Sequence, residues 1–564
     1  MKQLPIGIDD FKELIQNDYH FVDKSLFIKD VIADGSKVIL ITRPRRFGKT
    51  INMSMLDYYF TNNSDQKLNL FANLEINKHK DLTSKHYHKY PTIFITFKDI
   101  KADDYDAAIG MFKFTMSKLY EQFKSQELLN TLSAAELEYF ERIIDNKVSD
   151  ITELKTSLTK LIDYLYNLYN KEVIVLIDEY DTPIHAAYSN DYYDDFIEVF
   201  KTFLGIALKG NKQLHKAVIT GITRVAQASI FSELNHFEVY SVLREDYGQY
   251  FGFAEDEVVK LLKKLTINGD LDEIRTWYNG YKIGQYTLYN PWSILNYLKQ
   301  KGEFAPYWLN TSDNRIIKSL INKSKPVIKS ALLDLLQGKT IEQPLQENLV
   351  FQNLEKSEEA IWALLLYSGY LTIESKKREG RRLIAGLFIP NKEVMHIYDE
   401  IVERWFGNAL SLEEYDKFIK SLIKGDLKTF GKVLSDYITE SGSYFDFNAN
   451  TKEQVFHCLI LGLVLGLREN YVIKSNQEAG YRRFDVALIP KDKDKTGILI
   501  ELKTADKESE LDAMAKTALE QINDKKYSLI FTDHSVEKIL LIGIAFWGKK
   551  LKLYSSNDKL EDLE

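Results

Sequence analysis

The chain has 564 residues and a formal net charge of −8, with 45% hydrophobic and 28% charged residues. This length exceeds what one hydrophobic core supports, so we expect roughly two to four domains. The acidic net charge excludes a uniformly basic nucleic-acid binder, so any nucleic-acid binding requires a local basic patch. The single cysteine, Cys458, excludes an intrachain disulfide and a multi-cysteine metal site, and it fits a reducing compartment.

Residues 1–245 alternate apolar runs with helical patterns. The predicted strands are Lys37–Thr42, Thr92–Phe97, Val173–Asp178 and Ala217–Gly221, and the long predicted helices are Tyr105–Lys124 and Ile151–Tyr169. Strands that alternate with helices are typical of a parallel sheet with helices on both faces. We therefore predict an α/β domain over residues 1–245.

The first strand leads into a phosphate-binding motif, KVILITRPRRFGKT. In such a loop, backbone N–H groups and the start of the next helix face phosphate oxygens, the lysine reaches the β and γ phosphates, and the following hydroxyl ligates Mg²⁺. Arg43 replaces the usual first glycine, Pro44 removes one N–H donor, and Arg43, Arg45 and Arg46 are expected to add positive charge beside the loop. The predicted nucleotide-binding residues are Arg45, Arg46, Phe47, Gly48, Lys49, Thr50 and Asp178.

Two later strands complete the predicted nucleotide site. Residues 172–181, EVIVLIDEYD, end in Asp178, expected to hold Mg²⁺, and Glu179, expected to activate the attacking water. Residues 216–226, KAVITGITRVA, end in Arg224, a candidate for sensing the γ-phosphate or stabilising developing charge. A loop that only caps the strand is the alternative interpretation of this last segment.

Residues 246–445 are predicted to be mostly helical. A helix is expected at Glu358–Tyr367, then strands at Tyr370–Glu374 and Arg382–Ile389, then helices over Asn391–Glu440. The turn between the two strands is predicted to hold Lys376, Lys377, Arg378 and Arg381. A helix followed by two strands with a cationic tip looks like the wing of a winged helix, and a solvated hairpin tip is the alternative.

Residues 446–564 return to an α/β pattern. The predicted strands are Tyr471–Lys474, Arg483–Pro490, Gly497–Leu502, Ser528–Thr532 and Lys538–Phe546. Asp485 and Glu501 lie on adjacent strand patterns, and Lys503 leaves the strand on the same face as Glu501. Metal-dependent phosphodiester cleavage needs carboxylates that hold Mg²⁺ and a cation that positions water and offsets charge. Asp485, Glu501 and Lys503 are therefore predicted catalytic residues, the two acids also being metal ligands.

Other residues of this region are candidates for the same site. Glu453, at the start of a helix, is the favoured further metal ligand, and Glu478 stays open as the alternative. Gln521 and Tyr527 are candidates for contact with the scissile region, with a surface position equally open. Residues 471–530 carry eleven Lys or Arg and eleven Asp or Glu, so this region is expected to bind nucleic acid weakly on its own.

No segment predicts a membrane protein. The first residues have no apolar signal core, and the longest apolar stretch, Val455–Leu467, is too short to span a bilayer and is predicted to be a buried helix. We expect a soluble, cytoplasmic protein without a membrane partner.

These segments together resemble a family of bacterial proteins with an N-terminal AAA-ATPase-like domain and a C-terminal domain of the PD-(D/E)XK nuclease superfamily. The resemblance spans nearly the whole chain and rests on LPIGIDDF, YHFVDKS, RPRRFGKT, LIDEYDTPI, TGITRVA, WYNGYKIG, YNPWSILNYL, NTSDN, GYLTI, IPN and GYRRFDVAL with ILIELK. It implies a P-loop fold, ATP and Mg²⁺ as cofactors, and nucleic acid, above all DNA, as partner. The residues that it assigns to these sites are Lys49, Thr50, Asp178 and Glu179, and Asp485, Glu501 and Lys503. Arg43 is usual at its position in this family.

Two functions from different classes follow from these signatures. The first is an ATPase-regulated, Mg²⁺-dependent nuclease, whose role in defence against foreign DNA or in mobile-element biology is an analogy alone. ATP would order its N-terminal module, with a homo-oligomer as one route, and Arg224 would act in its own subunit or in a neighbour's. The second is a nucleotide-dependent switch or scaffold whose C-terminal domain binds nucleic acid or protein without cutting.

Overall fold

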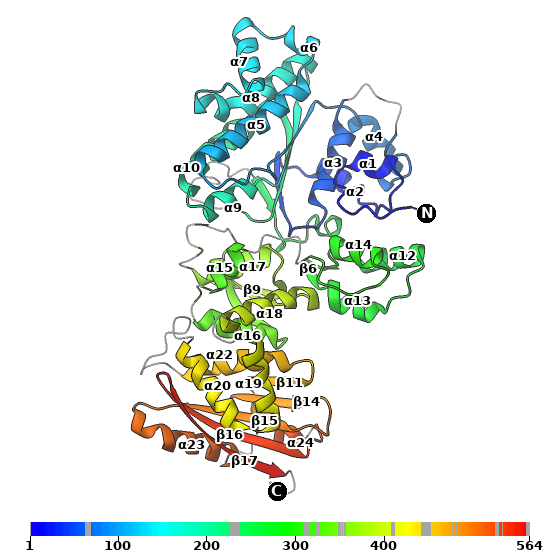
Figure 1. Cartoon of the computed structure of the whole chain (residues 1–564). Coiled ribbons are helices and arrows are strands. Elements are labelled where there is room, and N and C mark those ends of the chain that lie inside the picture. Colours follow the sequence, from blue (N-terminus) through cyan, green and yellow to red (C-terminus); the bar gives the residue numbers. More distant parts are fainter. Residues whose placement is uncertain are drawn as a thin grey trace. The chain divides into compact units, whose positions relative to one another are not determined.

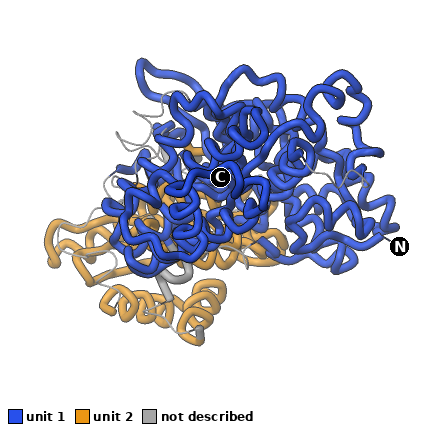
Figure 2. Tube along the Cα trace, turned by 90° about the horizontal axis from the view of Figure 1, so that it is seen from above, with its two compact units in different colours: residues 1–317, 342–394 blue, residues 318–341, 395–564 orange. Residues whose placement is uncertain are grey.

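The computed structural model of the chain describes most of residues 2–559 (Figure 1). The residues within this range that it does not describe are 63–68, 225–236, 309–314, 323, 325, 348–350, 352–353, 355–356, 408–411, 441–452, 476–477, 480–481, 525–528 and 533. Tyr527 and the side chain of Glu478, both candidates from the sequence, lie outside the described part. The chain forms two compact units, residues 1–317 with 342–394 (unit 1) and residues 318–341 with 395–564 (unit 2) (Figure 2).

Unit 1 is built around a five-stranded parallel sheet. Its strands are β1 Val38–Thr42, β2 Thr92–Thr96, β3 Val173–Asp178, β4 Leu214–Gly221 and β5 Phe237–Tyr240, in the order β2-β3-β4-β1-β5. β1 and β3 are buried along their whole length, as expected for parallel strands covered on both faces. The parallel α/β fold and the first four strands are as predicted. β5 was missed because its half-exposed sequence, FEVY, is not an apolar run.

Helices cover both faces of this sheet. Figure 1 shows α1–α4 on one side and α5, α8 and α10 on the other. The helices of this part are α1 Phe11–Gln16, α2 Leu26–Ala33, α3 Lys49–Phe60, α4 Lys80–His86, α5 Tyr105–Phe123, α6 Gln126–Leu129, α7 Ala134–Ile144, α8 Ile151–Tyr169, α9 Thr182–Ser189 and α10 Tyr193–Leu208, with the 3₁₀ turn η1 at Glu75–Lys78. The sheet and α3 together define the loop at residues 43–48.

A mostly helical part of unit 1 follows the sheet. It contains η2 Gly248–Tyr250, α12 Glu255–Leu265, α13 Leu271–Tyr278, the hairpin of β6 Tyr281–Ile283 and β7 Tyr286–Leu288, and α14 Pro291–Lys299. Leu261, Tyr278, Ile294 and Tyr297 belong to its buried apolar cluster. α14 begins at an Asn-Pro turn: the Asn290 side chain accepts hydrogen bonds from the N–H groups of Trp292 and Ser293.

The predicted helix-plus-hairpin element is present, with one correction. α17 spans Glu358–Tyr367, and β9 Thr372–Glu379 and β10 Arg382–Phe388 form an antiparallel pair beside β8 Ile341–Leu345. Lys376, Lys377 and Arg378 lie on β9 and not in the turn, because the strand continues to Glu379. Lys377 and Arg378 pair with acidic side chains and Lys376 donates to the carbonyl of Leu243, so these cations are engaged within the protein.

Unit 2 contains a mixed five-stranded sheet. Its strands are β11 Tyr471–Ser475, β14 Val486–Pro490, β15 Gly497–Thr504, β16 Lys538–Trp547 and β17 Lys550–Lys559, in the order β11-β14-β15-β16-β17, with only β15 and β16 parallel. β12 Glu478–Ala479 pairs with β13 Arg482–Arg483. Residues Leu529–Thr532 form the short helix α24, so the strand predicted at Ser528–Thr532 is wrong. Its apolar run is compatible with either structure.

The remaining helices complete unit 2 or join it to unit 1 along the chain. They are α15 Arg315–Asn322, α16 Pro326–Leu336, α18 Lys392–Gly407, α19 Leu412–Lys424, α20 Leu427–Glu440, α22 Glu453–Val464 with η5 Leu465–Leu467, and α23 Leu511–Asp524 after η6 Glu508–Glu510. Residues 246–317 and 342–394 belong to the same compact unit as the parallel sheet. The division into three domains, residues 1–245, 246–445 and 446–564, stays a prediction.

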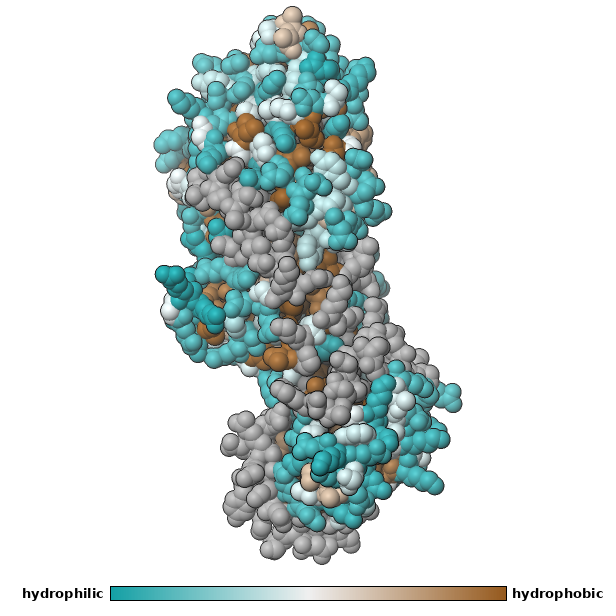
Figure 3. Space-filling model, turned by 90° about the vertical axis from the view of Figure 1, so that its left-hand side faces the viewer, coloured by the Kyte–Doolittle hydropathy of each residue, from teal (hydrophilic) through white to brown (hydrophobic). Residues whose placement is uncertain are grey.

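The face of the described residues seen in Figure 3 is largely hydrophilic, and its apolar areas lie between polar ones. The exposed large hydrophobic side chains of unit 1 include Phe114, Tyr169 and Ile206, a scatter that is ordinary for a globular surface. Within the described ranges, no helix is both long and apolar enough to cross a bilayer.

Candidate functional site

The loop between β1 and α3 has the backbone of a phosphate-binding loop. Gly48 caps α3 with φ of 83°, and Arg46 adopts φ of 67°. Positive φ is uncommon for residues other than glycine, and such strained positions cluster at functional sites. The N-terminus of the twelve-residue helix α3 therefore lies directly after the loop, where its unpaired N–H groups suit an anion.

Lys49 and Thr50, the first residues of α3, meet the end of β3. The Thr50 hydroxyl donates to Asp178 Oδ2 at 2.7 Å, and the Thr220 hydroxyl donates to Asp178 Oδ1. Burial, with the neighbouring Glu179 charge second, raises the pKa of the Asp178 carboxyl. A hydroxyl and a carboxylate brought together in this way are the ligands expected for Mg²⁺ beside a triphosphate.

The Lys49 ammonium lies inside the loop. Its Nζ donates to the carbonyls of Arg43, at 3.2 Å, and Pro44, at 3.1 Å, and lies 3.2 Å from Glu179 Oε1. Glu179 itself has φ of 54°, a strained backbone at the end of a buried strand. The two residues predicted to act on a triphosphate therefore form an ion pair.

Arg43 does not lie beside the phosphates, which corrects the expectation from the sequence. Its side chain is fully buried, and its guanidinium donates to the carbonyls of Thr42, Tyr240 and Asp246 at 2.7–2.9 Å. Burial lowers the pKa of this guanidinium to about 9. Arg43 therefore ties the loop to the end of β5 and to the segment after it, a structural role that explains why a large side chain replaces the glycine.

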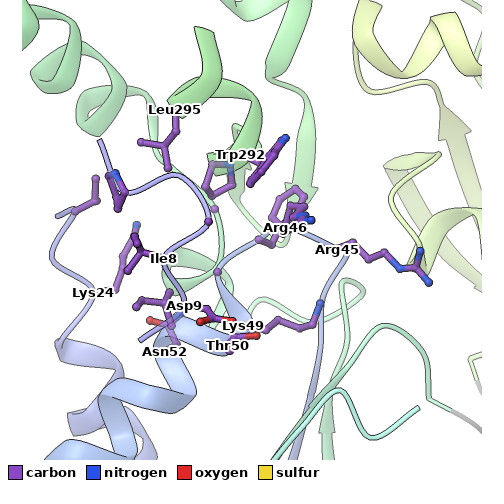
Figure 4. A pocket seen from close by; sticks show the side chains of 18 of the residues that line it. Ile8, Asp9, Lys24, Arg45, Arg46, Lys49, Thr50, Asn52, Trp292 and Leu295 are labelled. Carbon is purple, nitrogen blue, oxygen red and sulfur yellow. The ribbon is translucent and has the colours of Figure 1, made fainter. Parts of the chain in front are cut away.

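The other predicted loop residues divide between the cavity and the core. The Arg46 guanidinium lies 4.4 Å from the ring centre of Trp292 on α14, a cation–π contact. Phe47 is buried and packs edge-on against Tyr281. Figure 4 shows the Arg45 side chain extending away from the Arg46–Trp292 pair. The loop thus contacts the helical part of unit 1 through two of its side chains.

A cavity of about 490 Å³ opens at this loop. The loop and the segment after β3 contribute Arg46, Lys49, Thr50 and Glu179 to its lining. Apolar side chains that include Ile8, Trp292 and Leu295 line it as well, together with the charged side chains of Asp9 and Lys24 (Figure 4). A cavity lined by both charged and apolar side chains suits a ligand that has both kinds of group, as a nucleotide does.

Asp181 connects the segment after β3 to the segment after β4 through hydrogen bonds. It is not among the site residues predicted from the sequence. The buried Asp181 carboxylate accepts from the backbone N–H groups of Ile222 and Thr223 and from the Thr223 hydroxyl, at 2.7–3.0 Å. Although burial acts to raise the pKa of Asp181, these bonds and His185 lower it. Arg224 follows directly, but it is not among the residues that line the cavity.

The structure brings the predicted residues of the C-terminal site together. Asp485 immediately precedes β14, Glu501 lies on β15, and the backbone N–H of Leu502 donates to Asp485 Oδ2 at 2.7 Å. Burial raises the pKa of Glu501 to about 8, with the Asp485 charge as the second cause, and burial raises the pKa of Asp485 to about 6. The positive charge of Lys503 acts to lower the pKa of both carboxylates, so it lies near them.

Glu453 and Gln521 also belong to this cluster. Glu453 is the first residue of α22, and burial raises its pKa while Lys503 opposes the shift and Asp485 reinforces it. The Gln521 amide on α23 donates to Glu501 Oε1. Within the described residues, no three His, Cys, Asp or Glu side chains converge closely enough to form a ready-made metal cluster, so Glu453 stays a predicted ligand.

The two central carboxylates nevertheless fit a divalent cation. Glu501 is buried, and its Oε2 atom has no hydrogen-bond partner in the part of the chain that the structure describes. A buried carboxylate oxygen without a partner costs free energy unless a cation or a proton satisfies it. Mg²⁺ is commonly held by one or two carboxylates, with water completing its shell.

The fold and these two sites define a P-loop ATPase-like unit joined in one chain to a nuclease-like unit. Residues 5–231 match the family described as "Predicted AAA-ATPase", and residues 451–555 match the PD-(D/E)XK nuclease superfamily. The chain therefore combines a domain of the AAA-ATPase-like family with a domain of the PD-(D/E)XK nuclease superfamily.

A relative from Azotobacter chroococcum mcd 1, described as an uncharacterized protein in the vnfD 5′ region, is 27% identical over 395 residues. The match covers 70% of this chain and 68% of the relative. The likeness extends over most of both chains and so includes more than a single motif.

Proposed function

We propose that the protein is an ATP-regulated, Mg²⁺-dependent nuclease that acts on DNA. The observation that carries this proposal is the pair formed by the buried Glu501 and the half-buried Asp485 beside Lys503, in a chain whose P-loop also pairs Thr50 with Asp178. The family matches support an ATPase-like domain and a nuclease-superfamily domain. ATP hydrolysis, cleavage and the choice of DNA are our inference.

In the nucleotide site, the N–H groups of the loop and Lys49 would bind the triphosphate, and apolar side chains of the cavity such as Trp292 and Leu295 would contact the base. Glu179, at the end of β3, would orient the attacking water. Thr50 and Asp178 would hold Mg²⁺, which would supply charge neutralisation at the phosphates.

In the nuclease-like site, Asp485 and Glu501 would hold the cation, and Lys503 would offset the negative charge that develops on the phosphate oxygens. The cation would supply Lewis-acid polarisation of the phosphodiester. Gln521 orients Glu501 through its amide. The role of this chain is thus to fix two carboxylates and one ammonium around the scissile bond.

The second candidate function is a nucleotide-dependent switch or scaffold that binds nucleic acid or protein without cutting. Two observations favour it: the described residues form no ready-made cluster of three metal ligands, and the cations of β9 are engaged by protein groups. Phosphate contacts dominate nucleic-acid affinity, so weak binding by the C-terminal unit would limit cleavage.

Cleavage of single- and double-stranded DNA and RNA with Mg²⁺ or Mn²⁺ separates the two functions. We expect metal-dependent cutting by the wild type, its loss in Glu501→Ala and Lys503→Ala, and its retention in Glu520→Ala, an exposed acid on α23. Absence of cutting of any substrate, together with ATP-dependent binding of DNA, would establish the switch or scaffold instead.

A further inference from the structure

His457 lies behind the carboxylates of the nuclease-like site and is not assigned by the motifs. It follows Glu453 by one turn of α22 and is 5% exposed. Its Nε2 atom is 3.1 Å from the backbone carbonyl oxygen of Asp485 and 2.8 Å from Ser475 Oγ. Because a carbonyl oxygen only accepts, Nε2 carries the hydrogen in this arrangement.

The surroundings of His457 connect three elements at one point. Ser475 ends β11 and lies opposite Val486 in the β11–β14 register, next to Asp485. The Ser475 carbonyl in turn accepts from Lys339 Nζ at 3.0 Å, and Lys339 also pairs with Asp334. His457 therefore joins α22 to the end of β11 and to the residue that begins the metal-binding pair.

Asp485 is held at both of its polar ends by this arrangement. Its carboxylate accepts from the Leu502 N–H on β15, and its carbonyl accepts from His457. Without the imidazole, the carbonyl loses its donor in a buried place, which favours a shift of the backbone just before β14. Because the carboxylate stands on that backbone, its distance to the cation changes as well.

We infer that His457 is a positioning residue of this site, which fixes the Asp485 backbone so that the Asp485 and Glu501 carboxylates meet one divalent cation. The inference rests on the proposed metal-dependent function of the site. Loss of groups that orient metal ligands typically lowers metal affinity or activity about 10–100-fold.

The test measures Mn²⁺ binding to the full-length chain without nucleotide, by electron paramagnetic resonance of the free ion. The binding that Glu501→Gln removes defines the site. We expect His457→Ala to weaken that binding about tenfold or more. His457→Gln should stay within about threefold, because its amide N–H reaches a similar position. His534→Ala, a histidine of the same unit outside this network, is the matched control.

Melting temperatures of all variants, and DNA cleavage by the wild type, complete the test. Weak Mn²⁺ binding in His457→Ala with recovery in His457→Gln supports the inference. Unchanged Mn²⁺ binding in His457→Ala, or equal damage in both variants, overturns it and leaves only a packing role. If the wild type binds Mn²⁺ at Glu501 but cuts no nucleic acid, the nuclease function fails while the positioning role of His457 is still decided by the affinities.

Discussion

Replacement of Glu501 by glutamine is expected to stabilise the metal-free protein while it removes metal binding. In the folded chain the pKa of Glu501 is raised to about 8 by burial and by the Asp485 charge, from 4.5 in the unfolded chain. A carboxyl whose folded pKa is raised contributes stability below pH 4.5, and this contribution is lost as the pH rises towards 8. Glutamine keeps the size and the Gln521 contact but has no charge to bury.

The magnitude follows from the same shift. Each pH unit between about 5 and 8 lowers the free energy of unfolding of the wild type by roughly 1.4 kcal/mol, a contribution that Glu501 shares with Asp485. In Glu501→Gln this position makes no such contribution. Between pH 5.5 and 7.5, the stability difference between the two proteins should therefore change by about 3 kcal/mol in favour of Glu501→Gln. Saturating Mg²⁺ should reduce the difference, because the cation binds only the wild-type folded state.

Hydrogen exchange with mass spectrometry measures this difference, since it gives the opening free energy of β14 and β15 separately from unit 1. Glu520→Gln, exposed on α23, is the control and should follow the wild type at each pH. A stability difference between Glu501→Gln and wild type that is the same at pH 5.5 and 7.5 would refute the reasoning, because it would show that Glu501 is not a buried, mutually repelled carboxylate.

Three further substitutions test unit 1. Arg43→Ala should lower the stability of unit 1 by about 3 kcal/mol, since it removes the donor to the buried carbonyls of Thr42 and Tyr240 and to the part-buried carbonyl of Asp246. An unchanged melting temperature would contradict the structural role. Trp292→Leu should weaken ATP binding, measured by calorimetry, about three- to tenfold, because it removes the cation–π contact with Arg46. If Trp292→Leu bound ATP as tightly as the wild type, α14 would be excluded from the site. Asp181→Asn should slow ATP hydrolysis about tenfold or more with little change in ATP affinity, because it loosens the Thr223 segment; equal losses in both would argue for general damage.

Local sequence was enough to predict the framework of both units. β3, α8 and α17 have the predicted bounds. An amphipathic helix such as α8 leaves a periodic apolar pattern, and a buried strand such as β3 or a buried helix such as α17 leaves a continuous one. The strongly polar β17, KLKLYSSNDK, has no such pattern and is stabilised by pairing with β16. The strand prediction at Ser528–Thr532 was wrong because its three apolar residues, Leu529, Ile530 and Phe531, do not distinguish a helix from a strand.

The roles of residues that act through contacts distant in sequence could not be predicted from the sequence. Arg43 looked like a phosphate ligand from its place in the loop, but its partners Tyr240 and Asp246 are about 200 positions away. Asp181 lies two positions after Glu179, in the same acidic motif. Its structural role becomes clear only from its hydrogen bonds to Thr223. His457 interrupts an apolar helix, which was the available signal: a polar residue in such a place needs a partner. The sequence does not say which one.

Control of the nuclease-like site by the nucleotide site is the central proposal for this protein. The direct measurement is the initial rate of DNA cleavage with Mg²⁺, with and without ATP, for the wild type and Lys49→Ala. We predict that ATP changes the wild-type rate at least about tenfold and leaves the rate of Lys49→Ala unchanged, since that variant lacks the ammonium that would hold the triphosphate. Equal cleavage by both proteins, with and without ATP, would contradict it and make the two units independent enzymes in one chain.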